Sequence, residues 1–110
     1  MKIKNLRDAE KLETGEGDMW PLVLGENLSF YYLEIPPQLE VPPHSHPREG
    51  ILYCLEGELE LISRDGKRSI GKDTALLLEP NEALGLKNLT KKTVKTLLIS
   101  GSSASGSVKG

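Results

Sequence analysis

The chain is 110 residues long, which suits one domain with its own hydrophobic core and leaves no room for a second. Its formal net charge of −2 comes from 14 basic and 16 acidic residues that are interspersed, with no basic block to follow a phosphate backbone, so we do not expect a nucleic-acid partner. The single cysteine, a start without a signal-like apolar run, and no stretch near the ~20 apolar residues of a membrane span predict a soluble, cytoplasmic protein.

The first third of the chain has a charged start followed by two strand patterns. Residues 1–17 mix charges with scattered apolar positions, and we expect an N-terminal arm with one or two helical turns over residues 8–12. Residues 19–24 form a short strand candidate. Residues 28–35 are rich in aromatic and branched side chains and stop at a Pro-Pro pair, which predicts a second strand.

The middle of the chain predicts a hairpin. Residues 57–62 alternate acidic residues with leucine, so Leu59 and Leu61 are expected to face a core while the glutamates face water. The Asp-Gly pair at residues 65–66 follows directly. Such a pair tolerates positive φ and is typical of a tight turn between two antiparallel strands.

The last third contains two further strands and a polar tail. Residues 74–78 form a continuous apolar run, which we expect to be buried on both faces of its sheet. Residues 93–99 alternate again. These patterns predict an all-β antiparallel domain over residues 18–100, followed by a disordered Gly/Ser-rich tail at residues 101–110.

Both histidines of the protein lie in one proline-rich segment. In an extended chain His44 and His46 point to the same side, with Cα atoms roughly 6.6 Å apart, which suits two imidazoles on one metal ion. The flanking prolines remove backbone donors and favour a strand entry or a barrel mouth. The alternative is a pair of exposed histidines on the rim.

Two blocks of the sequence resemble the two signature motifs of the cupins, over residues 35–99. Cupins are small antiparallel jelly-roll β-barrels, also called double-stranded β-helices, with a metal site inside the barrel. The first motif is matched by His44, His46 and Gly57. The second motif is matched by the Gly71-Lys72-Asp73 turn, the apolar strand at residues 76–78, the Pro80-Asn81 turn and Asn88. The resemblance implies a barrel with this metal site.

The sequence departs from the family at two of the four ligand positions, which fall on Gly50 and Leu84. A bulge at Gly50 with positive φ would turn Glu49 inward beside the histidines. Together with His44 and His46 this would form a two-His, one-carboxylate set, suited to one divalent transition metal such as Fe, Mn, Ni or Zn. Otherwise Glu49 pairs with its basic neighbour or with water at the rim.

The resemblance also places a pocket beside the histidines. We expect Leu52, Cys54 and Leu84 to line it, with Leu84 adding apolar surface that favours a dry cavity or an apolar ligand. A regular strand holds Cys54 about 13 Å from position 50, too far to complete a metal site, so it is expected to act as a small core hydrophobe.

Three functions fit a barrel with an incomplete metal site. The first is a small-molecule binding or sensing module. The second is a metal-dependent oxygenase or isomerase that uses His44, His46 and Glu49. The third is a non-catalytic subunit or interaction domain. No nucleophile with a placed base is visible in the sequence, so binding ranks first.

A homodimer is the expected assembly. An open barrel leaves edge strands that have to be covered, and residues 2–6 have the alternation to pair with a second chain across a two-fold axis.

Overall fold

The structure is a computed structural model that describes residues 1–103. These residues form one short 3-10 helix, η1 (Leu6–Asp8), and ten strands. The strands are β1 (Leu12–Thr14), β2 (Gly17–Leu24), β3 (Leu28–Ile35), β4 (Glu40–His44), β5 (Arg48–Glu56), β6 (Leu59–Ser63), β7 (Gly66–Ile70), β8 (Thr74–Leu78), β9 (Leu84–Lys87) and β10 (Val94–Ser103). The described part of the chain has no helix that is long and apolar enough to cross a membrane.

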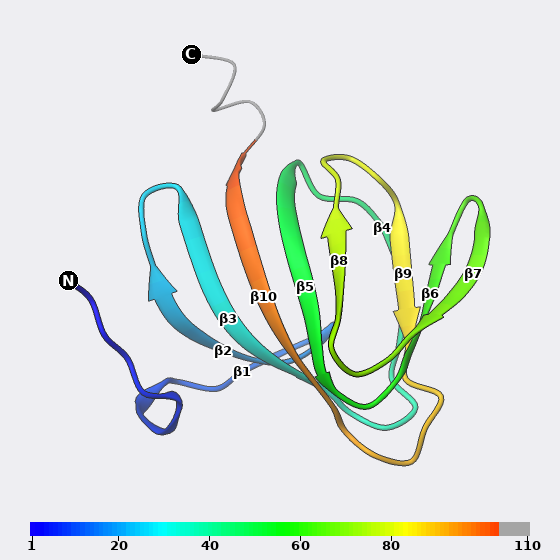
Figure 1. The fold of residues 1–110 in the computed structure, drawn as a ribbon, viewed down its shortest axis with the longest axis horizontal. Coiled ribbons are helices and arrows are strands. Elements are labelled where there is room, and N and C mark those ends of the chain that lie inside the picture. The colour runs from blue at the N-terminus through cyan, green and yellow to red at the C-terminus, as the bar shows by residue number, and fades with distance from the viewer. Residues whose placement is uncertain (104–110) are drawn as a thin grey trace.

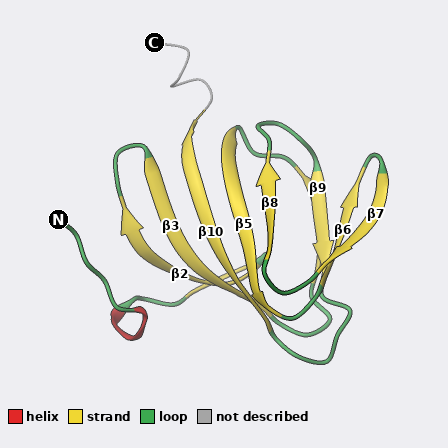
Figure 2. Ribbon diagram, viewed as in Figure 1, coloured by secondary structure: helices red, strands yellow, loops and turns green. Residues whose placement is uncertain are grey.

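The strands form two antiparallel sheets (Figure 1). The larger sheet has the order β1-β2-β3-β10-β5-β8, and the smaller has the order β4-β9-β6-β7. Strands distant in sequence are neighbours, since β10 lies between β3 and β5 and β9 lies between β4 and β6. Strands and loops make up almost all of the ribbon (Figure 2). The predicted fold class, an all-β antiparallel jelly-roll, is confirmed.

The core lies between the two sheets and takes side chains from both. On β6, Leu59 and Leu61 point inward and are buried, as their alternation with acidic residues predicts. Burying such a side chain fully stabilises the fold by about 1.5–3 kcal/mol. The buried cluster consists of Leu33, Ile35, Leu52, Cys54, Leu59, Leu61, Ile70 and Val94.

The predicted hairpin joins β6 to β7, but its two-residue loop is shifted by one position. Arg64 and Asp65 form the loop, and Gly66 is the first residue of β7, paired with Ser63. The φ angle of Gly66 is +117°, so this position requires a residue without a Cβ.

Both ends of the described chain carry more strand than the sequence predicts. The predicted arm contains β1, which pairs with β2, and its helical turn lies at Leu6–Asp8 instead of residues 8–12. The Asn5 side chain accepts a hydrogen bond from the Arg7 N–H, which caps the helix at this earlier place. At the other end β10 continues to Ser103, while the rest of the predicted tail, residues 104–110, lies outside the described residues.

The apolar run at residues 74–78 is not buried on both faces in the single chain. Leu76 and Leu78 pack against the core, whereas Leu77 is 51% exposed on the outer side of β8.

Asn88 joins the loops at the base of the molecule. This fully buried side chain donates from Nδ2 to the carbonyls of Ile35, Pro36 and Lys92. Its Oδ1 accepts from the N–H and the hydroxyl of Thr90. The second-motif asparagine is therefore a structural residue that satisfies loop carbonyls.

Candidate metal site

Three donor side chains meet at one end of β4. His44 is the last residue of β4, His46 follows two positions later, and Glu16 lies in the turn between β1 and β2. One donor atom from each lies within 4.8 Å of the other two. The imidazole rings are 4.7 Å apart between centroids and meet edge to face at 84°. The two histidine side chains therefore lie on the same side of the chain, as their spacing predicts.

The orientation of the His44 ring is fixed by a backbone contact. Its Nδ1 donates a hydrogen bond to the Pro42 carbonyl at 3.0 Å, and a carbonyl can only accept, so the proton sits on Nδ1. The neutral ring then carries a lone pair on Nε2. A metal-binding histidine typically donates a hydrogen bond from its other ring nitrogen, as His44 does from Nδ1, and this bond holds the ring in place.

The Nε2 atom of His44 is buried and unsatisfied. It lies 3.3 Å from a carboxylate oxygen of Glu16, without the geometry of a hydrogen bond. Among the described residues it has no hydrogen-bond partner. In the tautomer with the proton on Nδ1, the lone pair of His44 Nε2 faces the Glu16 carboxylate oxygen, and both atoms are acceptors. A cation bound between the two atoms would remove this repulsion and satisfy the buried nitrogen.

Glu16 is held by a tight turn. Its N–H donates to the Thr14 hydroxyl, which in turn donates to the Gly17 carbonyl at 2.7 Å. Gly17 has a φ angle of +120°, and a Cβ built there would lie 2.5 Å from the Glu34 carbonyl oxygen. The turn therefore needs glycine at this position, and it places the Glu16 carboxylate over the two histidines.

The donor set suits a divalent transition metal. Two imidazole nitrogens and one carboxylate oxygen are ligands that Zn, Fe and Mn accept, and three protein ligands leave coordination positions open. His46 lies further from the carboxylate than His44 does, because its Nε2 is 4.0 Å from the Glu16 carboxylate oxygen and that of His44 is 3.3 Å from it. A bound ion would be held by His44 Nε2, His46 and Glu16.

Glu49, the carboxylate that the sequence favours, is not part of this group. It is exposed on β5, and Gly50 is not among the glycines with positive φ. Gly50 pairs in regular register with Leu78 and Ser100, and the nearby irregularity falls on β10. The structure therefore brings Glu16 to the histidines, while Glu49 as a ligand stays a prediction.

Sequence reasoning missed Glu16 because the contact joins residues 28 positions apart. The only local signal is the turn-forming segment at residues 14–17, which marks a hairpin and carries no information on what the turn approaches.

The three predicted pocket residues belong to the packed interior. Leu52 and Cys54 are buried in the core cluster, and Leu84 packs against it from the smaller sheet. Leu84 is the cross-strand partner of His44 in the β4–β9 pair. The resemblance to the second cupin motif placed position 84 beside the histidines, and the pairing of β4 with β9 agrees with this placement. The side chain at this position is the apolar Leu84.

Burial makes Cys54 a poor nucleophile. Desolvation raises the pKa of its thiol, and Sγ donates to the Gly57 carbonyl at 3.5 Å. We expect a disulfide reagent to react with the folded protein roughly 10³-fold or more slowly than with the denatured protein, since reaction requires unfolding. Absorbance of the released thiolate measures both rates. Rapid labelling of the native state would contradict this prediction.

The comparisons with known proteins agree with the architecture. The family model of the cupin domain matches residues 31–100. The chain therefore belongs to the cupin family. Among curated proteins, none matches this sequence.

Solved structures share the fold at low identity. The polyketide cyclase RemF from Streptomyces resistomycificus superimposes with a TM-score of 0.82 at 21% identity, covering 92% of this chain and 79% of that one. An RmlC-like cupin from Shewanella frigidimarina gives 0.82 at 13%, covering 96% and 95%. Ectoine synthase from P. lautus gives 0.79 at 18%, covering 92% and 78%. At these identities the likeness shows the fold alone.

Proposed function

We propose that the protein binds one divalent transition-metal ion through Glu16, His44 and His46, and that the bound ion in turn holds a small molecule. The observation that supports this most directly is the buried, unsatisfied Nε2 of His44, which faces a carboxylate 3.3 Å away. Removing a polar atom from water without a partner is costly, and coordination would offset that cost.

The small-molecule part of the proposal rests on the open coordination positions. A three-ligand site leaves room for water or for a ligand with oxygen or nitrogen donors. The ion would supply Lewis-acid polarisation of such a ligand. The chain itself orients the His44 imidazole through the Pro42 carbonyl and the Glu16 carboxylate through the β1–β2 turn. Because Leu52, Cys54 and Leu84 fill the interior, the ligand is expected at the mouth.

A metal-dependent enzyme is the second candidate. The open ligand set supports it, because catalytic metal sites keep such a position while purely structural sites are closed. RemF and ectoine synthase are enzymes by name, and they share the fold. If the protein converts a candidate substrate and this activity disappears when the metal is removed, the protein is a metal-dependent enzyme and not a binding protein alone.

Two glutamate variants test the proposed ligand set. Protein stripped with a chelator is titrated with Zn²⁺ or Mn²⁺ by calorimetry. Structural zinc sites with four ligands bind with about 10–16 kcal/mol, or about 3 kcal/mol per ligand. Glu16→Gln, which removes one ligand, is therefore expected to weaken binding about 100-fold.

Glu49→Gln is the matched control, because Glu49 is an exposed glutamate on β5, the strand that follows the two histidines along the chain. We expect its affinity to equal that of the parent. If Glu49→Gln weakens binding and Glu16→Gln does not, the ligand is Glu49 and the assignment to Glu16 is wrong. A parent protein without metal affinity would refute the proposed function itself.

A further inference from the structure

The segment that carries Glu16 has little attachment to the rest of the domain. We call residues 1–16 the strap. All of these residues are exposed except Ala9, which is half-buried, and no strap side chain belongs to the buried core cluster. Its larger apolar side chains stay in water, since Ile3 is 83% exposed and Leu12 is 41% exposed. Hydrophobic burial therefore contributes little to holding the strap in place.

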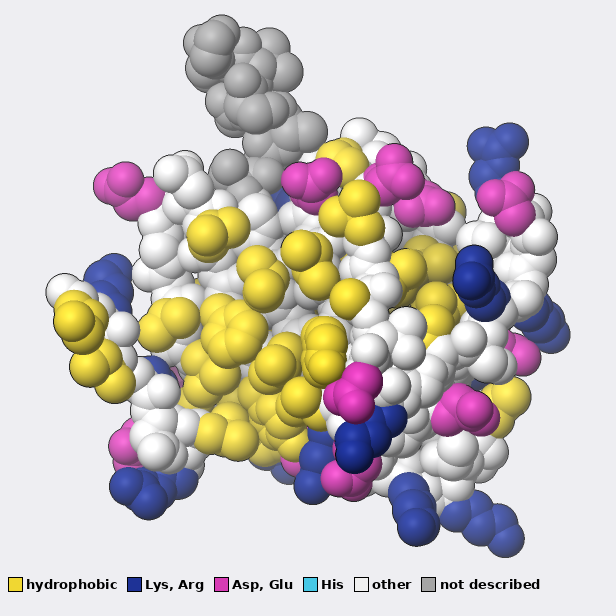
Figure 3. All heavy atoms as spheres, viewed as in Figure 1, with side chains coloured by type: hydrophobic (Ala, Val, Ile, Leu, Met, Phe, Trp, Pro, Cys, Tyr) yellow, Lys and Arg dark blue, Asp and Glu magenta, His cyan; other side chains and the backbone are white. Residues whose placement is uncertain are grey.

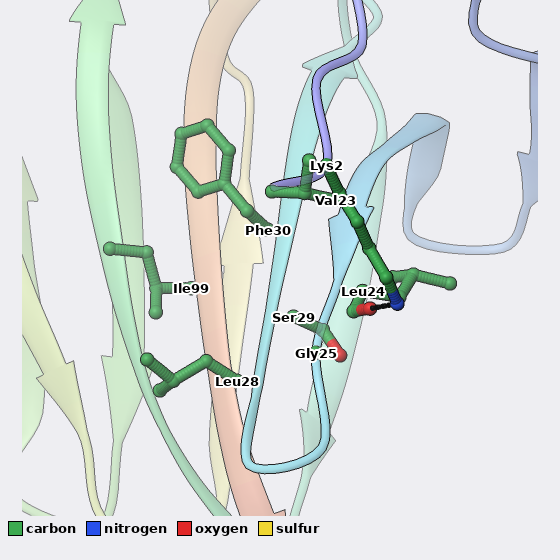
Figure 4. Close-up of a pocket in the computed structure, with 8 residues that line it drawn as sticks. All are labelled: Lys2, Val23, Leu24, Gly25, Leu28, Ser29, Phe30 and Ile99. Atoms are coloured by element: carbon green, nitrogen blue, oxygen red, sulfur yellow. Dashed lines mark hydrogen bonds between the residues drawn. The ribbon is translucent and has the colours of Figure 1, made fainter.

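The start of the strap lies beside the larger sheet and leaves its apolar face uncovered. Figure 3 shows hydrophobic side chains gathered over β2, β3, β10 and β5, open to view. One hydrogen bond of 3.2 Å fastens the strap here, from the Lys2 ammonium to the Leu24 carbonyl. Figure 4 shows this contact at the rim of a hollow of about 460 Å³, which Val23, Phe30 and Ile99 help to line. Among the residues that line the hollow, Lys2 alone comes from the strap, so the hollow does not bury the strap's apolar side chains.

The far end of the strap is held by a short strand pair and by one lysine. β1 pairs with β2 at three positions. The Lys11 ammonium lies 3.7 Å from the Asp18 carboxylate and 5.9 Å from the centre of the Trp20 ring. Partly exposed ion pairs and short strand pairs stabilise a structure only weakly. A segment with so few buried contacts opens locally far more readily than the core does.

Glu16 is the point where the strap meets the other sheet. β1 is an edge strand of the larger sheet, and β4, which ends at His44, is an edge strand of the smaller sheet. In the described part of the chain the two sheets share no strand pair. The Glu16 carboxylate lies 3.3 Å from Nε2 of His44 and 4.0 Å from Nε2 of His46. An ion held by these three side chains would therefore join the edges of the two sheets.

We propose that metal binding closes the strap over the histidines and that loss of the metal lets the strap open. The inference rests on the proposed metal site. The ion reaches Glu16 only when the strap is closed, so it stabilises the closed form over an open form that offers the two histidines alone. Without the ion, the acceptor atoms of Glu16 and His44 face each other, and their contact does not hold the strap. Occupancy of the metal site thus controls how accessible the N-terminal segment is.

Limited digestion of the full chain with trypsin tests this inference. Trypsin cleaves after lysine and arginine, and the bond after Lys11, directly before β1, becomes accessible when the strap opens. The open form lacks one ligand and should bind the ion about 100-fold more weakly, as Glu16→Gln does. With Zn²⁺ at about 100 times its dissociation constant, we expect cleavage after Lys11 to be at least about 10-fold slower than in the metal-free protein, with a limit of about 50-fold.

Two variants and a binding measurement separate this inference from the proposed function. Glu49→Gln keeps the strap ligand and should be protected like the parent, whereas Glu16→Gln should be cleaved at the same rate with and without Zn²⁺. The second variant also controls for any effect of Zn²⁺ on trypsin. Calorimetry on the same samples measures binding. If the parent binds Zn²⁺ but cleavage after Lys11 does not slow, or if Glu16→Gln is protected like the parent, the strap inference is wrong and the metal proposal is unaffected. A parent that binds no metal would overturn both.

Hydrogen exchange followed by mass spectrometry gives a second readout without trypsin in the sample. We expect the peptide that covers β1 to exchange more slowly when Zn²⁺ is bound to the parent, because closing the strap protects its strand pair with β2. In Glu16→Gln the same peptide should exchange at one rate in both conditions. Equal exchange of this peptide in the parent with and without bound Zn²⁺ would contradict the closing of the strap.

Discussion

The double substitution His44→Ala with His46→Ala is expected to abolish metal binding. It removes two of the three proposed ligands, at about 3 kcal/mol each, so affinity should fall by more than about 10³-fold. Calorimetric titration of chelator-treated protein measures the loss. Both side chains are partly exposed at the mouth, at 37% and 61%, so the fold should survive and the melting temperature without metal should stay near that of the parent. Undiminished binding in the double variant would place the metal elsewhere.

Leu84→His is the complementary gain-of-ligand variant. Since position 84 pairs directly with His44, an imidazole there adds a nitrogen donor on the same side of the sheet. We expect tighter metal binding than in the parent, measured by the same titration. If affinity does not rise, then position 84 does not face the histidines, despite the register.

Asn88→Ala is expected to have the largest effect on stability. The substitution removes the three hydrogen bonds that Asn88 Nδ2 donates to carbonyls and the two that its Oδ1 accepts from Thr90. A hydrogen bond of this kind contributes about 0.5–1.5 kcal/mol, so we expect a total loss of about 3–5 kcal/mol. Such a loss is a large part of the 5–15 kcal/mol that typically holds a domain together. Chemical denaturation followed by circular dichroism measures it.

Two further variants calibrate this measurement. Asn27→Ala removes an exposed asparagine near the β2–β3 turn and should change stability by less than about 0.5 kcal/mol. Thr90→Ala removes one donor to the Asn88 Oδ1 and should cost about 1 kcal/mol. If Asn88→Ala costs no more than Asn27→Ala, the hydrogen-bond network at Asn88 does not stabilise the fold.

The strands themselves follow from local pattern. Leu59 and Leu61 are buried because a strand turns successive side chains to opposite faces, and this alternation can be read without knowing the partner strands. The Asp-Gly pair marks the hairpin for another local reason, its tolerance of positive φ. The helical turn at Leu6–Asp8 follows from a local cap as well, since the Asn5 side chain accepts from the Arg7 N–H. The one-residue shift of the hairpin loop is less local, because it reflects the register between β6 and β7.

The sequence by itself determined the strand pattern, the family and the placement of His44 and His46 on one side of an extended segment, because each depends on residues that are close along the chain. Only the tertiary structure decided the third donor. Glu16 reaches the histidines because the β1–β2 turn folds over the end of β4, a contact between distant segments that no periodicity encodes. The tertiary structure likewise decided that Leu77 faces outward. The smaller sheet covers only the inner face of the larger sheet, so the outer face of β8 stays exposed although the whole strand is apolar.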